Sequence, residues 1–310
     1  MSRRSQSGGL SVKAAERLRP LLESFLASTD TRSRITADPV EFPHRYTDPR
    51  DIEVSALLAA ALAYGRADLF RPKVDGLLGR MGAAPAAFVR GLDVLGAREL
   101  LHGFVYRFNV GTDVAVLLLG MGKALREHGS LEALFVRGWE ARGSMHGALS
   151  DFTAALRDVP MAELRRALGK ERGLHHLLPS PLGPGAAKRL NLYLRWMVRG
   201  GDGVDFGIWK RVPASALVIP LDTHIGRIAK HLGLTRRNDL SWRTAEEVTA
   251  SLRRLDAADP VRYDFALCHY GMSGVCPARP VADNCAKCLL LSSCAVGPRL
   301  TRSRASASGP

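Results

Sequence analysis

The sequence has few aromatic residues and no long apolar run. Aromatic residues make up 6% of the 310 positions although 46% are hydrophobic, so the core must consist mainly of aliphatic side chains, as in many helical proteins. No apolar stretch approaches the roughly 20 residues that a membrane-spanning helix needs. The first twenty residues also lack the apolar segment of a secretory signal. We therefore expect a cytoplasmic protein that is not bound to a membrane.

Strand patterns are equally scarce. No alternation of apolar and polar residues lasts more than about five residues, and no internal repeat is visible. Helical spacing covers most of the chain, and we expect helices over 11–28, 51–65, 67–82, 112–129 and 144–159. The sequence thus predicts an all-α fold over residues 10–298. Basic tails with little apolar surface, residues 1–9 and 299–310, are predicted to be disordered.

Negative charge is in short supply. The chain has 44 Lys and Arg against 30 Asp and Glu, which gives a formal charge of +14. Such a surplus favours a polyanionic partner, of which nucleic acid is the usual one. Charge alone also fits a protein that is merely basic.

Cysteine is rare and unevenly placed. Four of the five cysteines lie within residues 276–294, as Cys276-x8-Cys285-x2-Cys288-x5-Cys294. A disulfide framework spreads its cysteines more widely, whereas a cluster of thiolates suits zinc or an iron–sulfur cluster. Zinc ribbons usually have two close pairs. The single close pair with two longer arms favours one [4Fe–4S] cluster, with zinc as the alternative.

A glycine-rich turn separates two helical segments in "SPLGPGAAKRLNLYLRWMVRG", residues 180–200. Gly183 and Gly185 flank Pro184, and Lys188 follows where the second helix begins. Glycines let an anion approach the backbone closely, and a helix N-terminus supplies free N–H groups to a phosphate. The turn is either such a site or an ordinary connection between helices.

An acid precedes the helix in "PLDTHIGRIAKHLGL", residues 220–234. Ile225, Ile228, Ala229 and Leu232 give this segment one apolar face. Asp222 stands directly before it, where aspartate commonly caps a helix. The same carboxylate can serve as a catalytic group if partners come from elsewhere in the chain.

Together the three features resemble the helix-hairpin-helix DNA glycosylase superfamily, which includes endonuclease III. In this resemblance "PLGPG" corresponds to the hairpin, Lys188 to the lysine of bifunctional members, and Asp222 in "LDTH" to the catalytic aspartate. Lys188 lies three residues after Gly185, one more than in the common hairpin. The cysteine spacing is similar to the endonuclease III cluster loop, with a longer first arm. The resemblance covers roughly residues 35–296 and is strongest to a bacterial branch of the superfamily.

The resemblance implies a two-lobed helical fold over residues 10–298, with an interlobe cleft and a [4Fe–4S] loop at 276–294. It implies a monomer that binds double-stranded DNA, flips a damaged or modified base out of the duplex and excises it. Asp222 would stabilise the cationic sugar. Lys188 would either attack C1′, which adds AP lyase activity, or contact phosphate. The residues predicted to contact DNA are Gly183, Gly185, Ala186 and Arg189.

Two other functions remain open from the sequence. One is a non-catalytic nucleic-acid-binding protein on the same scaffold, and the other is a phage-defence enzyme that excises modified bases. Four aromatic residues near the hairpin are candidates for base stacking, but their helical spacing favours packing in the core. They are Tyr193, Trp196, Phe206 and Trp209.

Overall fold

The structure of the chain is a computed structural model that describes the backbone of residues 9–307 and the side chains of residues 9–303. Nearly all regular structure in this part is helical. The exception is a small antiparallel hairpin of β1 (Val105–Tyr106) and β2 (Asn109–Val110), in which Tyr106 pairs with Asn109. The predicted all-α class is therefore confirmed. None of the helices described is both long and apolar enough to cross a membrane.

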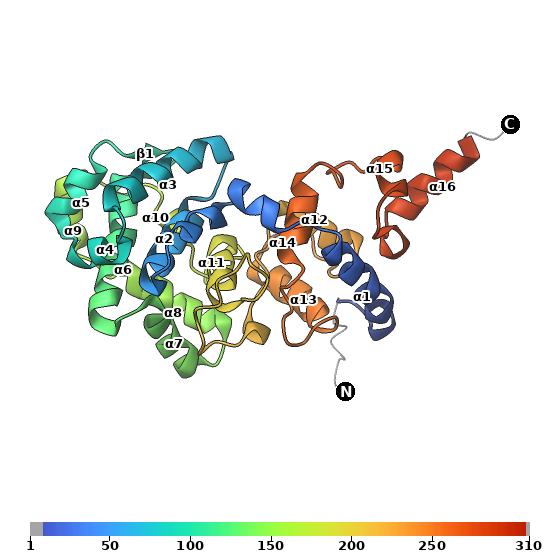
Figure 1. Cartoon of the computed structure of the whole chain (residues 1–310), viewed down its shortest axis with the longest axis horizontal. Coiled ribbons are helices and arrows are strands. Elements are labelled where there is room, and N and C mark those ends of the chain that lie inside the picture. The colour runs from blue at the N-terminus through green and yellow to red at the C-terminus, as the bar shows by residue number, and fades with distance from the viewer. Residues whose placement is uncertain (1–8, 308–310) are drawn as a thin grey trace. The chain divides into compact units, whose positions relative to one another are not determined.

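The chain divides into two compact units. We call residues 32–216 the central unit, and residues 1–31 with 217–310 the terminal unit. The interlobe cleft implied by the resemblance stays a prediction. Figure 1 labels the helices of both units. The central unit contains 3₁₀ turns at Arg32–Ala37, Pro39–Glu41, Pro43–Arg45 and Ala214–Ala216, and the helices α2 (Pro49–Leu62), α3 (Ala67–Met81), α4 (Pro85–Gly91), α5 (Val94–Leu101), α6 (Gly111–His128), α7 (Leu131–Arg142), α8 (Met145–Arg157), α9 (Met161–Leu168), α10 (Leu174–Leu177) and α11 (Lys188–Val198).

The core of the central unit forms around α2 and α6. Every residue of α2 from Asp51 to Leu62 is buried, and α6 is buried along most of its length. Two glycines let α6 approach its neighbours. A Cβ on Gly120 would lie 2.1 Å from the Leu156 carbonyl oxygen, and one on Gly122 would lie 2.0 Å from that of Val89. Glycine is required there because any side chain would collide with the backbone of α8 or α4.

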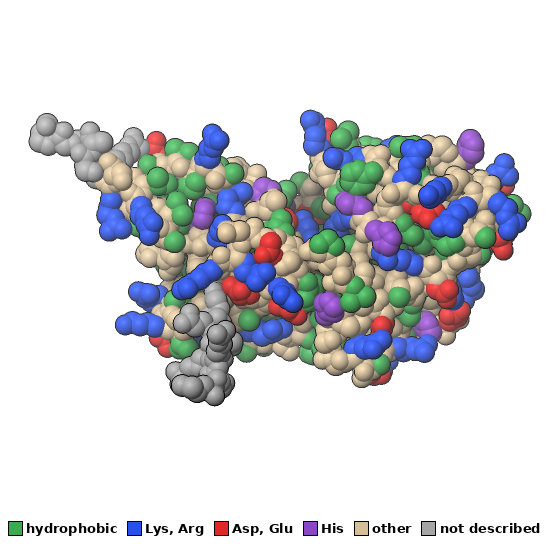
Figure 2. All heavy atoms as spheres, turned by 180° about the vertical axis from the view of Figure 1, so that it is seen from behind, with side chains coloured by type: hydrophobic (Ala, Val, Ile, Leu, Met, Phe, Trp, Pro, Cys, Tyr) green, Lys and Arg blue, Asp and Glu red, His purple; other side chains and the backbone are tan. Residues whose placement is uncertain are grey.

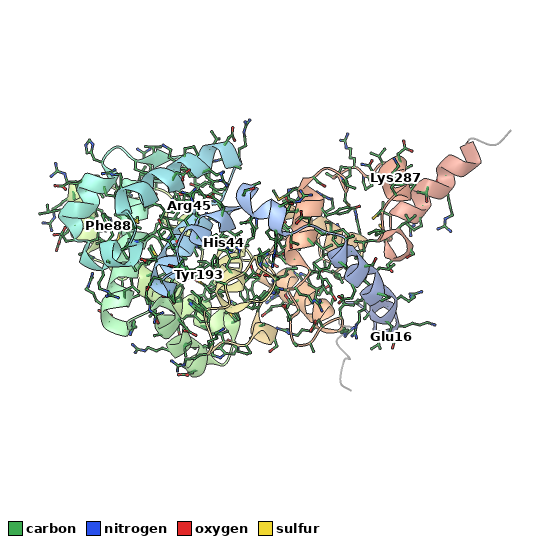
Figure 3. The ribbon with its side chains drawn as sticks, viewed as in Figure 1. Glu16, His44, Arg45, Phe88, Tyr193 and Lys287 are labelled. Carbon is green, nitrogen blue, oxygen red and sulfur yellow. The ribbon has the colours of Figure 1, made fainter. Side chains whose placement is uncertain are left out.

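The aromatic residues of α11 and of the segment that follows it belong to this core. Tyr193, labelled in Figure 3, and Trp196 have no exposed surface, and Trp209 is 2% exposed. The rings of Tyr193 and Trp209 meet edge to face at 5.5 Å. Phe206 lies against His44 at 4.5 Å. Core packing is therefore confirmed for the three buried rings, and none of them is available to stack on a base.

The terminal unit is built from both ends of the chain. Its first helix begins after Ser11, whose hydroxyl accepts the Ala14 N–H, and it buries an apolar stripe at helical spacing. The stripe consists of Ala15, Leu18, Leu22 and Phe25. The elements of this unit are α1 (Val12–Ala27), α12 (Thr223–His231), α13 (Trp242–Arg253), α14 (Asp264–Met272), α15 (Ala282–Ala286), a 3₁₀ turn (Leu291–Ser293) and α16 (Gly297–Ala307).

The predicted disorder of the C-terminal tail was wrong for most of its length. Residues 299–307 are helical and belong to α16. Pro298 occupies the first turn of that helix, where its missing N–H has no cost, and Arg, Leu and Ala are good helix formers. Of the N-terminal tail, residues 1–8 lie outside the described part.

Candidate functional site

The glycine-rich turn is an exposed loop in the central unit. It runs from Leu182 to Gly185, between α10 and α11, and Leu182 is 77% exposed. The Gly183 N–H donates to the Ser180 carbonyl at 2.9 Å, which closes a β-turn. The turn therefore presents backbone and apolar surface to solvent immediately before a helix.

The backbone conformation requires glycine at neither position of this turn, and at Gly185 the surrounding structure does not require it either. Gly183 and Gly185 both lie outside the left-handed region of φ. A Cβ on Gly185 would meet no atom within 4 Å, and one on Gly183 would meet only the Ser180 carbonyl oxygen at 3.2 Å. Glycine that is not needed for folding is expected where another molecule approaches the backbone.

Two buried alanines connect this turn to α11. Ala186 and Ala187 are each 4% exposed. Ala187 caps the helix in the left-handed conformation, with φ 48° and ψ 40°. Lys188 is the first residue of α11 and is partly exposed. The lysine therefore lies at the helix N-terminus, beside the exposed turn.

Arg189 does not fit its predicted role as a DNA contact. Its side chain is buried, and its guanidinium donates to the carbonyl oxygens of Ala61 and His176. Burial lowers its pKa to about 10, so it stays charged at neutral pH. A guanidinium held in this way ties α11 to α2 and α10, and the expected phosphate contact is replaced by a structural one.

Asp222 caps α12 in the terminal unit, as its sequence position predicts. Its Oδ1 accepts the N–H groups of His224 and Ile225 at 2.9 and 2.8 Å. Its Oδ2 faces the Cys268 thiol of α14 at 3.8 Å. The cap fixes the orientation of the carboxylate, with one oxygen on the N–H groups of α12 and the other facing α14. The catalytic role of Asp222 stays a prediction, as does that of Lys188 in the other unit.

The four clustered cysteines line one cavity in the terminal unit. Cys285 lies in α15, and Cys294 directly follows the 3₁₀ turn. Polar hydrogens point at two of the sulfurs. The Tyr270 hydroxyl lies 3.2 Å from Cys288 Sγ, and the Gly297 N–H donates to Cys294 Sγ at 3.3 Å. Bonds of this kind are among those that tune the potential of an iron–sulfur cluster.

The same cysteines do not converge on a single point. Among the residues described, no three His, Cys, Asp or Glu side chains are close enough together to hold one metal ion. Burial raises the pKa of the Cys276 and Cys285 thiols, so any metal that binds there must displace protons. What the four residues share is the cavity that they line.

The residue that anchors this loop to α12 is Arg227, for which the sequence suggested a phosphate contact or an exposed surface position and not this structural role. Arg227 donates to the carbonyl oxygens of Gly271 and Cys276 at 3.0 and 2.7 Å. It thereby ties the helix capped by Asp222 to the start of the cysteine loop. Its helical position, five residues after Asp222, gave no signal that distinguishes it from a surface arginine.

The long segment after α11 is also held by charges that the sequence did not reveal. Asp205 is buried and accepts from Arg195 at 3.0 Å and from Arg199. Farther along, the Trp209 indole donates to Glu53 Oε1 at 2.7 Å. Burial raises the pKa of both carboxyl groups, against the lowering effect of their partners. These bonds fix the segment to α11 and α2.

Comparison with known proteins gives a family. Residues 38–273 match the family described as a protein of unknown function, DUF2400, and because this match spans most of the chain, the chain belongs to that family. No curated protein matches the chain.

Proposed function

We propose that this DUF2400 chain is a DNA glycosylase that flips a damaged or modified base out of duplex DNA and removes it. The observation that carries the proposal is the exposed turn 182–185, which leads into α11 at Lys188. The likeness to helix-hairpin-helix glycosylases, the capping geometry of Asp222 and the cysteine cavity support it. On the face shown in Figure 2, Lys and Arg side chains are widely spread, which suits a polyanionic partner.

The turn is suited to bind a backbone phosphate. Gly185 has open space where a side chain would stand, so an anion can reach the backbone. The N-terminal end of α11 adds the positive end of a helix dipole, and Lys188 adds a charge. Such contacts fix the register of the protein on DNA and carry no sequence information.

In the proposed reaction, the C1′–N bond breaks and its electron pair leaves with the base, which takes up a proton. The sugar gains positive charge as this happens, and the Asp222 carboxylate stabilises that charge. The neutral amine of Lys188 forms the new bond to C1′ and releases one proton. The C1′–O4′ bond then breaks and O4′ takes up a proton, which opens the sugar ring and leaves a protonated Schiff base between Lys188 and C1′. Loss of a C2′ proton breaks the C3′–O bond, so the 3′-phosphate leaves by β-elimination and the strand is cleaved. If water attacks instead, the enzyme releases the base without cleaving the strand.

The four cysteines would hold a [4Fe–4S] cluster. A [4Fe–4S] cluster binds one thiolate on each of its four irons, so its four ligands lie around a cavity. A single zinc ion instead requires four ligands that converge on it. The cavity lined by all four cysteines and the donors from Tyr270 and Gly297 fit the first arrangement better. Bound there, the cluster would stabilise the segment that follows α14.

A panel of duplexes tests the proposal, each with one damaged or modified base, scored for release of the base. Asp222→Asn should nearly abolish release yet keep DNA binding, because asparagine still caps the helix but loses the charge. Asp93→Asn is the matched control, since Asp93 is an exposed cap of α5 that accepts the Gly96 N–H. Equal release by wild type and Asp222→Asn would return Asp222 to a purely capping role. DNA binding without release from any duplex would favour the non-catalytic alternative.

Borohydride trapping separates the two roles of Lys188. If Lys188 is the nucleophile, the wild type gives a covalent adduct with DNA and Lys188→Gln gives none. Lys13→Gln, at an exposed position of α1, is the control and should trap normally. Base release that persists in Lys188→Gln, with moderately weaker binding, would make Lys188 a phosphate contact.

A further inference from the structure

An exposed aromatic ring stands at the tip of the β1–β2 hairpin. The two residues at the tip are Arg107 and Phe108, and Phe108 is 45% exposed. Arg107 has φ 52°, a conformation that is costly for a residue other than glycine. Among the large apolar side chains that are exposed in the described residues, Phe108 is the only aromatic one.

Phe108 does not stand alone. Its ring is stacked on that of Tyr64 at 5.3 Å, with an angle of 13° between the planes. The imidazole of His176, on α10, meets both rings edge-on at 4.4 Å. We call Tyr64, Phe108 and His176 the aromatic cluster. Nothing in the proposed glycosylase chemistry uses it.

Buried hydrogen bonds hold the cluster in place. The Tyr64 hydroxyl donates to Asn109 Oδ1 at 2.5 Å, and Asn109 Nδ2 donates to the buried Asp113 at 3.1 Å. Asp113 also accepts the N–H groups of Val110 and Gly173, at 2.9 and 3.0 Å, so it ties the hairpin to the start of α10. The rings are therefore ordered before any ligand arrives, which lowers the entropy cost of binding.

Two guanidinium groups lie against rings of the cluster. The guanidinium of Arg189 lies 4.9 Å from the centre of the Tyr64 ring, and that of Arg107 lies 5.7 Å from the centre of Phe108. Partial burial of the ring and these two charges lower the pKa of His176 to about 4. The imidazole is thus neutral at neutral pH and presents an uncharged ring among cations.

We infer that the aromatic cluster stacks an unpaired base of a nucleic-acid strand on Phe108, while Arg107 contacts a phosphate of the same strand. This inference rests on the proposed function only in taking nucleic acid as the partner. A base offers a π-face to the exposed ring, and its strand offers the negative charge that Arg107 attracts. An apolar protein segment would match the ring but would leave the charge of Arg107 without a complement. Because Arg189 joins α11 to His176, the cluster lies next to the helix that begins with Lys188.

The test measures binding of the full chain to two kinds of duplex. One contains a single unpaired 2-aminopurine, whose fluorescence falls when the base stacks, and the other is fully paired. Phe108→Leu keeps the apolar volume and loses the aromatic face. It should weaken binding of the unpaired-base duplex by about 5- to 150-fold, since stacking one base contributes about 1–3 kcal/mol, and should remove the quenching. Binding of the paired duplex should not change. Phe108→Trp should restore quenching.

Phe88→Leu is the matched control, at a partly exposed phenylalanine of α4 labelled in Figure 3, and should behave as wild type. If Phe108→Leu folds and quenches as well as wild type, the inference fails while the proposed function stands. If the wild-type chain binds neither duplex, the inference and the proposed function fail together.

Discussion

The substitution Gly185→Ala, in the glycine turn, should affect DNA binding without weakening the fold. In the free protein the added methyl group meets no atom within 4 Å, and the backbone does not require glycine. The substitution also restricts the unfolded chain. We therefore expect the free energy of unfolding to stay unchanged or rise by about 0.4–1 kcal/mol.

DNA binding should respond in the opposite direction. If a phosphate approaches the backbone at Gly185, the methyl group displaces it and weakens at least one charge-assisted hydrogen bond, which contributes about 1.5–3 kcal/mol. Because each 1.4 kcal/mol is a factor of about ten, the dissociation constant should rise by about 10- to 100-fold. Fluorescence anisotropy with a labelled duplex, at fixed low salt, measures this change, and urea denaturation measures stability.

Gly76→Ala is the control for this experiment. Gly76 is an exposed residue of α3, where a Cβ also meets nothing within 4 Å, so the variant should be slightly more stable and bind DNA as wild type does. A Gly185→Ala protein that is folded and binds DNA within about twofold of wild type would refute the reasoning, because it would show that no ligand approaches the turn.

Two further predictions concern the cysteine loop and the buried charges. Wild-type protein purified without oxygen should contain about four irons per chain, and Cys288→Ser should lose most of this iron and loosen the segment after α14. Cys268→Ser, outside the loop, should retain the iron. One zinc per chain in colourless wild-type protein would contradict the cluster. Asp205→Asn should destabilise the central unit by about 3–5 kcal/mol in urea denaturation, because it removes the buried countercharge of Arg195 and one of the two carboxylates that pair with Arg199. Asp151→Asn, at an exposed pair, should cost less than about 1 kcal/mol, and equal losses would show that burial does not matter.

Helices could be predicted from the sequence where apolar residues at helical spacing are followed by a residue that ends a helix. The predicted range 67–82 corresponds to α3 (Ala67–Met81), and 112–129 corresponds to α6 (Gly111–His128), with Gly82 and Gly129 directly after them. Glycine ends a helix there because both residues have positive φ. Local chemistry decided these boundaries, so the sequence alone was sufficient.

Contacts between distant segments were not predictable in the same way. Arg189 follows Lys188 in the sequence and was expected to face DNA, yet its guanidinium reaches the carbonyl of Ala61, on α2. A lysine or arginine on an amphipathic helix gives no signal of which partner it will meet, because that depends on tertiary packing. Asp222 was the easier case, since its capping bonds lie within the same four residues.

The position of Lys188 at the start of α11 depends on the backbone conformation of the residue before it. The sequence places one more residue between Gly185 and the lysine than the common hairpin has, which suggests that the lysine is rotated by one helical position. The structure instead accommodates two residues before the helix by turning Ala187 into the left-handed conformation, so α11 begins at Lys188 itself. Alanine carries no sequence signal for that conformation, which costs it about 1–2 kcal/mol and is normally adopted by glycine or asparagine. Ala187 is 4% exposed, so the residue that adopts this torsion is packed within the central unit, and the start of α11 depends on a buried residue outside the glycine turn.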